Sequence, residues 1–339
     1  MKSSLRLRAF RRSEMTLVIA FLLAFCPAAA AQTLKGVNFA SPAFFPSHLP
    51  GVYGHDFIYP NEEEIEYFID KGMNVFRISI LWERLQPTLN GPLDPGELKR
   101  LSAFIKDVEQ RGGFTIIDIH NYGGYRRVTV GQSPVTDAAF ADLWTRLALR
   151  FGQDDHVIFG LMNEPQVSRA SLWQQAVQKA IDGIRGTGAR NMIFVSGIAW
   201  DGAEHFVEIS GKSLGALTDP QHRLIFEVHS YFDADASGTS DTCVSPPEAV
   251  ARLTAFTQWL RAGNRRGFLG EFGVSSRPEC LMVLKNVASY LQENADVWLG
   301  WTWWAAGPWW GNYMFTIEPK AGTDRPQMLV LESFLHSSS

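Results

Sequence analysis

From Leu34 onward, short apolar runs alternate with longer amphipathic segments, and this alternation limits the possible folds more than any other feature. Eight apolar runs occur, at residues 34–40, 73–80, 114–122, 157–165, 191–198, 224–231, 266–274 and 297–307. Apolar strands separated by helices indicate parallel β-structure covered by helices. Eight such units predict an α/β fold, the (β/α)8 or TIM barrel.

The segments between the runs carry helix signals. In PGELKRLSAFIKDVEQRG, apolar side chains recur at helical spacing at Leu98, Leu101, Ile105 and Val108. Pro95 suits the first turn of this helix and Gly112 suits its end. An open doubly wound sheet is the alternative, but no glycine-rich phosphate loop follows the first run. No linker, repeat or low-complexity block divides the chain, so a single barrel domain over residues 32–339 is expected.

Residues 1–31 have the order of a secretory signal peptide. A basic head is followed by the apolar stretch TLVIAFLLAFC and then by the small residues PAAAA. The apolar stretch is shorter than the roughly 20 residues that a membrane span requires, which disfavours a permanent anchor. We therefore expect cleavage after Ala31 and a secreted protein, either extracellular or periplasmic, with no membrane attachment after cleavage.

The charge of the mature chain excludes some classes of partner. Residues 1–31 hold five basic residues and one acidic residue, so the formal net charge of −4 becomes −8 after cleavage. Nucleic acids and anionic membranes both require a basic face. Neither is expected as a partner, and a monomer is expected.

Two cysteines, Cys243 and Cys280, remain after the signal peptide and its Cys26 are removed. An even number of cysteines in an oxidising compartment predicts a disulfide. Both are expected in loops just beyond the sixth and seventh strands, which are neighbours in a barrel. Two separate buried thiols are the alternative.

Polar side chains gather where the predicted strands end, and in a TIM barrel this edge carries the active site. The strands bring Arg77, His120, Asn121, Asn163, Glu164, His229, Tyr231, Glu271, Trp303 and Trp304. Any one of them alone would be read as a capping or solvated residue. Six strands ending in this way at one rim indicate a functional site.

Glu164 and Glu271 are the candidate catalytic pair. Two carboxyl groups facing each other suit glycosidic bond hydrolysis, in which one donates a proton and the other attacks or activates water. Asn163 is a candidate for binding a sugar hydroxyl, and Arg77 for keeping one carboxylate ionised. A metal site built with His120 and His229 is the alternative. We expect no metal, because no HxH or HExxH spacing occurs and Arg77 would repel a cation.

Tryptophans indicate a carbohydrate substrate, because aromatic faces stack on sugar rings. The chain has 11, and those predicted in loops after strands are Trp82, Trp200, Trp304, Trp309 and Trp310. The stretch GPWWGNY, residues 307–313, is predicted to form a cleft wall. By contrast, the tryptophans predicted on helices, Trp144, Trp173 and Trp259, are expected in the core.

The motifs GVNFA, FRIS, DIHNY, GLMNEP, HSYFDADASGTSDTC, GEFG and LGWTWWAAG together resemble glycoside hydrolase family 5, also called cellulase family A. The resemblance covers essentially the whole mature chain. Within the family, the sequence is most similar to secreted β-1,4-endoglucanases of filamentous fungi and some bacteria. GEFGV departs from the more usual Thr-Glu turn, with no expected change in chemistry.

The resemblance implies roles for single residues. Glu164 matches the general acid/base and Glu271 the nucleophile of a retaining, double-displacement enzyme without a cofactor. The remaining active-site set, implied to bind substrate, is Arg77, His120, Asn163, His229, Tyr231 and Trp304. Trp304 is preferred to Trp303 because strand alternation from Gly300 puts residues 302 and 304 on one face.

The implied function is an endo-β-1,4-glucanase acting on a β-glucan polysaccharide. No cellulose-binding module or linker accompanies the predicted barrel, so soluble or amorphous glucan is the expected substrate. Mannanase, xyloglucanase and mixed-linkage glucanase activities remain alternatives within the family. A barrel that binds glycans without cutting them is the alternative from another class.

Overall fold

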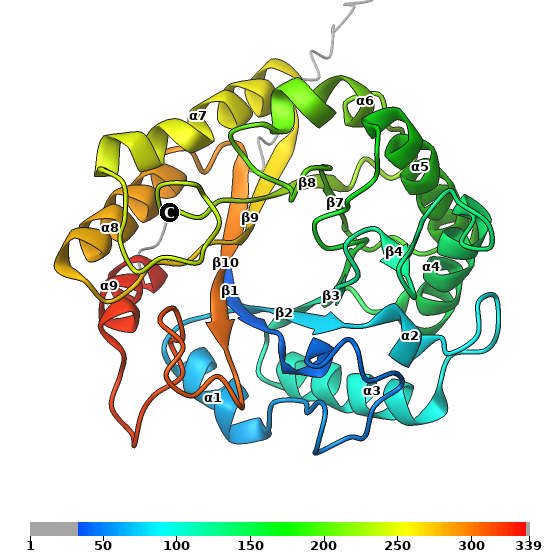
Figure 1. Cartoon of the computed structure of the whole chain (residues 1–339), viewed down its shortest axis with the longest axis horizontal. Helices are drawn as coiled ribbons and strands as arrows, with labels where there is room; N and C mark the ends of the chain where they lie inside the picture. The colour runs from blue at the N-terminus through cyan, green and yellow to red at the C-terminus, as the bar shows by residue number, and fades with distance from the viewer. Residues whose placement is uncertain (1–32, 337–339) are drawn as a thin grey trace, which may run out of the picture. The chain divides into compact units, whose positions relative to one another are not determined.

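The computed structural model describes residues 33–336, which fold around a closed barrel of parallel strands (Figure 1). Around the barrel the strands follow in chain order: β1 (Leu34–Phe39), β2 (Val75–Ile80), β3 (Phe114–Ile119), β6 (Val157–Gly160), β7 (Ile193–Ser196), β8 (Leu224–His229), β9 (Arg266–Glu271) and β10 (Trp298–Ala306). β10 pairs with β1 and closes the barrel. The predicted TIM barrel is confirmed, whereas the predicted signal peptide lies outside the described residues.

Helices surround the ring of strands (Figure 1). They are α1 (Glu62–Asp70), α2 (Trp82–Leu85), α3 (Pro95–Gln110), α4 (Asp137–Phe151), α5 (Ala170–Gly186), α6 (Lys212–Leu214), α7 (Pro246–Ala262), α8 (Pro278–Glu293) and α9 (Pro326–Leu335). α3 begins at Pro95 as predicted, and the Asp94 side chain caps it by accepting the Glu97 N–H. Across residues 33–336, no helix is long and apolar enough to cross a membrane.

Several strands end earlier than the apolar runs predicted. The run 157–165 contains β6 only as far as Gly160, and the run 114–122 contains β3 only as far as Ile119. Beyond these points, single contacts replace the continuous ladder, such as the bond from Asn163 N–H to the Ile119 carbonyl. The residues with the expected chemistry on these two runs therefore lie on loops rather than within strands.

Each barrel strand contributes one side chain to an apolar layer inside the barrel. The layer consists of Leu34, Val75, Ile116, Ile158, Phe194, Ile225, Phe268 and Leu299, all buried. Two residues further along three of the strands, the inward positions are ionisable: Arg77, Asp118 and Glu227. Side chains alternate between the two faces of a strand, so these groups lie above the apolar layer, toward the C-terminal ends of the strands.

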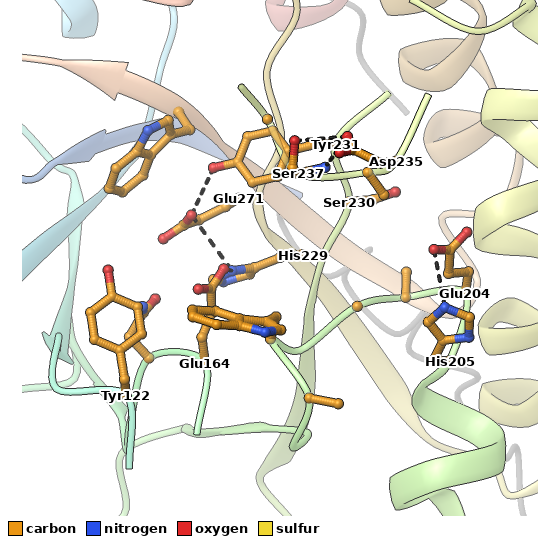
Figure 2. Close-up of a pocket in the computed structure, with 18 of the residues that line it drawn as sticks. Tyr122, Glu164, Glu204, His205, His229, Ser230, Tyr231, Asp235, Ser237 and Glu271 are labelled. Carbon is orange, nitrogen blue, oxygen red and sulfur yellow. Dashed lines mark hydrogen bonds and ion pairs between the residues drawn. The ribbon is translucent and has the colours of Figure 1, made fainter. Parts of the chain in front are cut away.

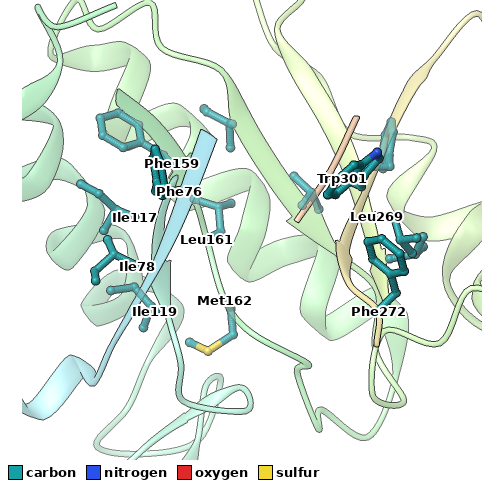
Figure 3. Packing of buried hydrophobic residues seen from close by; sticks show 14 of the residues in the cluster. Phe76, Ile78, Ile117, Ile119, Phe159, Leu161, Met162, Leu269, Phe272 and Trp301 are labelled. Atoms are coloured by element: carbon teal, nitrogen blue, oxygen red, sulfur yellow. The ribbon is translucent and has the colours of Figure 1, made fainter. Parts of the chain in front are cut away.

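The intervening side chains point outward and form the main core. Phe76, Ile78, Ile117 and Ile119 belong to this cluster between the barrel and its helices (Figure 3). The barrel is therefore apolar on its outer surface and at its floor. Its interior becomes polar only near the rim where the candidate site lies.

Candidate active site

A cavity of about 580 Å³ opens at the C-terminal end of the barrel (Figure 2). Seven of the eight sequence-predicted site residues line it: His120, Asn163, Glu164, His229, Tyr231, Glu271 and Trp304. The eighth, Arg77, lies in mid-strand on β2 and is fully buried. Residues from six strands or their following loops thus meet in one place.

Glu164 is held by a strained backbone and by one histidine. It lies four residues beyond the end of β6, and its φ is 39°, in the left-handed region. Such a conformation is uncommon for a residue other than glycine and clusters at functional sites. Its Oε1 lies 2.8 Å from Nδ1 of His229 (Figure 2). The strained backbone and the histidine together fix this carboxyl group against the cavity.

Glu271 is the last residue of β9, and a β-bulge sets its direction. Val228 pairs with Leu269 but His229 pairs with Glu271, so β9 contains one extra residue at this point. A bulge of this kind re-aims the side chain that follows it. Phe268 points into the barrel, so strict alternation would turn Glu271, three residues later, outward. Because of the bulge, Glu271 faces the same cavity as Glu164 instead.

Three donors surround the Glu271 carboxyl group. Tyr231 donates its hydroxyl to Oε2 at 2.8 Å, and Nη1 of Arg77 donates to Oε1 at 3.1 Å. Nδ1 of His229 lies 3.5 Å from Oε2. Burial raises the pKa of Glu271 and the Glu164 charge adds to this effect, whereas His229 and Arg77 act in the opposite direction.

Arg77 is the centre of a buried ionic cluster. It contacts Asp118 at 3.1 Å and Glu227 at 2.9 Å in addition to Glu271. Its Nη1 also donates to the Asn38 side chain. Burial opposes its charge, but the three carboxylates outweigh burial and raise the pKa of the guanidinium. Arg77 therefore remains a cation beneath the carboxylate pair.

Sequence reasoning did not single out Asn38, Asp118 or Glu227. A signal for the two acids exists, because DIH and EVH both place an acid two residues before a histidine on one strand face. Asp118 accepts from His120 Nδ1 at 2.8 Å, and Glu227 lies 3.6 Å from His229 Nε2.

The surroundings of His229 favour its charged form. Burial disfavours the charged ring, but the nearby carboxylates Glu271, Glu164 and Glu227 raise its pKa well above the ordinary value. Its Nδ1 lies 2.8 Å from Oε1 of Glu164, at hydrogen-bond distance. The charge of His229 offsets part of the repulsion between the two carboxyl groups.

Glu164, His229 and Glu271 each offer one possible ligand atom, and these three atoms lie within 4.8 Å of one another. This spacing could hold a cation, so the metal alternative must be tested against the neighbours. A metal ligand needs a neutral imidazole, whereas the carboxylates around His229 favour its charged form. The guanidinium of Arg77 also contacts Glu271 directly. These charges favour carboxylate chemistry over a metal centre.

One polar side chain and one ring pair mark the wall of the cavity. Asn163 uses its Oδ1 to accept from Arg77, while its buried Nδ2 has no hydrogen-bond partner within residues 33–336. A sugar hydroxyl would satisfy this donor. His120 stacks on Trp304, with ring centroids 5.7 Å apart and an angle of 13°. The pair forms a flat wall beside the carboxylates.

The aromatic predictions hold only in part. Trp200 is 60% exposed and lines the cavity, whereas Trp303 is fully buried. The prediction for Trp82 is wrong: this residue begins α2, is fully buried and donates its Nε1 to Gln86. Because the short helix α2 begins almost directly after β2, the Trp82 indole points into the core.

In the stretch 307–313, Tyr313 lines the cavity, but Trp309 and Trp310 are not among its lining residues. Trp310 instead packs edge-on against Trp304 at 5.6 Å. The predicted cleft wall is therefore mostly a support behind Trp304. Of the three predicted core tryptophans, Trp144 and Trp173 are fully buried and Trp259 is partly buried against the core.

The predicted disulfide between Cys243 and Cys280 is present, with Cα atoms 5.4 Å apart. Cys243 lies in the loop after β8, as expected. The expected loop position of Cys280 is wrong, because this residue lies in the first turn of α8. The bridge joins the β8–α7 loop, which carries Tyr231 and Asp235 of the cavity, to a helix.

Comparisons with known proteins find a family model and relatives that match most of the chain. The family described as Cellulase (glycosyl hydrolase family 5) matches residues 33–307. Endo-beta-1,4-glucanase B of Aspergillus niger is 40% identical over 297 residues, covering 87% of this chain and 88% of that protein.

Two solved structures are similar over nearly the same span. XacCel5A in complex with cellopentaose has a TM-score of 0.88 and 43% identity, covering 89% of this chain and 99% of that one. The Pseudomonas stutzeri endoglucanase Cel5A in complex with cellobiose has a TM-score of 0.84 and 35% identity, covering 89% and 92%.

Proposed function

The chain belongs to the cellulase family, glycosyl hydrolase family 5, and from this we propose that it is a retaining endo-β-1,4-glucanase that uses Glu164 and Glu271. The observation that carries the proposal is the spacing of the two carboxyl groups, which bring one oxygen each within 4.8 Å. Oxygens this close suit a retaining glycosidase, whose carboxyl groups lie roughly 5–5.5 Å apart, better than an inverting one, which leaves about 6.5–9.5 Å between the groups for a water molecule.

The surroundings of each carboxyl group support the division of roles. Glu271 receives hydrogen bonds from Tyr231 and Arg77, and donors of this kind stabilise the ionised form that attacks the anomeric carbon. The Glu164 carboxyl group accepts a hydrogen bond from His229 and lies on a loop at the cavity surface, where it can protonate the leaving oxygen and later activate water.

The substrate follows from the cavity and from the relatives. The stacked pair of His120 and Trp304 offers an apolar wall for a sugar ring, and the unpaired Asn163 amide offers a donor for a hydroxyl. Two relatives were crystallised with cellopentaose and cellobiose. A β-1,4-glucan chain fits both the lining of the cavity and the ligands of these relatives.

The test is to follow hydrolysis of a cello-oligosaccharide by proton NMR. A retaining enzyme releases the β-anomer first, and the α-anomer appears only by mutarotation. The α-anomer as first product would overturn double displacement. Sugar binding without any release of reducing ends would favour the non-catalytic alternative. A parallel panel of mannan, xyloglucan and mixed-linkage glucan ranks the substrates.

We also propose that residues 1–31 are removed on export and that residues 32–339 form one catalytic domain. Support comes from the basic, apolar and small-residue order at the N-terminus and from the disulfide, which persists in oxidising compartments. N-terminal sequencing of the exported protein should begin at Gln32. A chain that retains Met1 would contradict cleavage.

A further inference from the structure

A second groove of about 610 Å³ continues from the catalytic cavity, and both hollows are lined by His120 and Tyr122. Its walls come from the loop after β1, from α2 and from a small hairpin that follows β3. A glucan chain that crosses the catalytic cavity on this side therefore continues into the groove.

The hairpin ends in an unusual turn. Its strands are β4 (Gly124–Tyr125) and β5 (Val128–Thr129), and they leave Arg126 and Arg127 as the two turn residues. Both have positive φ, 46° and 65°, which defines a type I′ turn. Such turns strongly favour Asn-Gly, because other residues are strained there. Two arginines are a poor choice for stability alone, and both line the groove.

The charges of the two arginines are not neutralised by the protein. Within residues 33–336, neither guanidinium has a carboxylate at ion-pair distance. The Arg126 guanidinium donates to the Pro87 carbonyl at 3.2 Å and lies over the Tyr125 ring, 5.7 Å from its centroid, and both arginines are exposed. In a chain of net negative charge, two exposed cations that no described carboxylate pairs need an explanation on one wall of the groove.

Neighbouring charges leave the groove positive. Glu83 is an acid in its wall, but it is buried and its two oxygens accept from Asn121 and from the Arg126 backbone N–H. Arg84, just behind, donates only to backbone carbonyls, such as that of Pro42. At the far end of the catalytic cavity the lining acids are Glu204 and Asp235 (Figure 2). The groove is thus the cationic end of the cleft, whereas Glu204 at the far end lies 3.2 Å from His205 and 3.8 Å from Arg252.

We propose that Arg126 and Arg127 bind carboxylate groups carried by the glucan chain, so that the enzyme prefers β-glucans with acidic sugars or acidic substituents on this side of the cleaved bond. The inference rests on the proposed function and narrows its substrate class. A guanidinium pairs with a carboxylate through parallel hydrogen bonds, which gives specificity as well as attraction. Because the contact lies away from the reacting atoms, its loss should raise KM more than it lowers kcat.

The experiment compares a neutral cellohexaose with two derivatives that carry one C6 carboxylate, at either terminal sugar. For wild type, kcat/KM should be higher for one of the two derivatives than for the neutral sugar. Arg126→Gln and Arg127→Gln should each reduce that preference about two- to five-fold, the range of exposed ion pairs. Activity on neutral cellohexaose should fall less than activity on the preferred acidic derivative. Raising the salt concentration to about 1 M should abolish the preference, because the screening length falls to about 3 Å.

Two further variants control for charge and for fold. Arg190→Gln removes an exposed arginine before β7, at the opposite end of the barrel, and should leave the preference intact. Arg126→Asn combined with Arg127→Gly gives the turn its favoured residues, so it should raise the melting temperature while losing the preference.

The outcomes separate the two proposals. An unchanged carboxylate preference in the Arg126→Gln/Arg127→Gln double variant would overturn this inference, as would the absence of any preference in wild type. Failure of wild type to cut neutral cellohexaose would instead overturn the proposed function.

Discussion

Glu164 and Glu271 reach the same cavity from different kinds of backbone. Glu164 lies on a loop with a left-handed φ of 39°, whereas Glu271 ends a strand and follows a bulge. Both devices orient a carboxyl group that regular strand geometry would have pointed elsewhere. At the scale of single residues, the proposed division of roles can therefore be tested by removing each group in turn.

We expect azide to rescue the two alanine variants with opposite stereochemistry. In Glu164→Ala, loss of the acid/base should slow turnover by about 10²- to 10⁴-fold, less for an aryl glycoside with a good leaving group. Azide should then attack the glycosyl-enzyme and give the β-glycosyl azide. In Glu271→Ala, azide would replace the nucleophile and give the α-azide.

NMR of the azide products decides the assignment. An α-azide from the Glu164 variant, or a β-azide from the Glu271 variant, would mean that the roles are exchanged. Glu164→Gln is the control for backbone strain, because it keeps the size of the side chain at the left-handed position.

The hydroxyl of Tyr231 should set the acidic limit of activity. Glu271 must be ionised to attack, and burial raises its pKa, so kcat/KM should begin to fall at a higher pH than for an ordinary carboxyl group. In Tyr231→Phe the carboxylate loses a donor at 2.8 Å. Since that donor favours the charged form, its loss raises the pKa of Glu271 further and moves the acidic limb to higher pH.

A pH profile of kcat/KM for both proteins checks this. Tyr290→Phe is the matched control, because Tyr290 donates to Thr257 on a helix and has no carboxylate partner among residues 33–336. Its acidic limb should coincide with that of wild type. An acidic limb for Tyr231→Phe at or below that of wild type would contradict the proposed role of the hydroxyl.

At the scale of elements, the disulfide restrains a loop of the site. Cys243 and Cys280 are 37 residues apart and tie the β8–α7 loop to α8. By the chain-entropy model, replacing both with Ser should lower the free energy of unfolding by about 3–4 kcal/mol. Urea unfolding with and without reductant measures the loss. Reductant should affect wild type but not the double variant.

The elements also show what sequence reasoning can and cannot reach. Eight apolar runs predicted the barrel, and Glu164 and Glu271 stood out because a carboxyl group at the end of such a run needs a reason. The Arg77 cluster was missed, since Asp118 and Glu227 become neighbours only when β3 and β8 curve around one axis. No sequence motif marks the bulge beside Glu271 or the helical turn that buries Trp82.

At the scale of the whole barrel, stability depends on the apolar layer to which every strand contributes. Phe194 is fully buried there and packs against Phe268 with ring centroids 4.8 Å apart. Phe194→Ala should cost about 3–5 kcal/mol of unfolding free energy. Leu149→Ala, at a side chain that is 72% exposed on α4, should cost little. Denaturant titration compares them, and equal losses would contradict the role of the layer.

The same apolar layer closes the barrel beneath the carboxylates. At the rim, the catalytic cavity lies beside the groove that Arg126 and Arg127 line. A polymer cannot thread through such a molecule and must lie across its mouth with both ends free. Cuts then fall at interior positions and release long fragments. A thick glucan solution would thin to a fraction of its viscosity while almost none of its sugar had become short enough to diffuse away as small oligosaccharides.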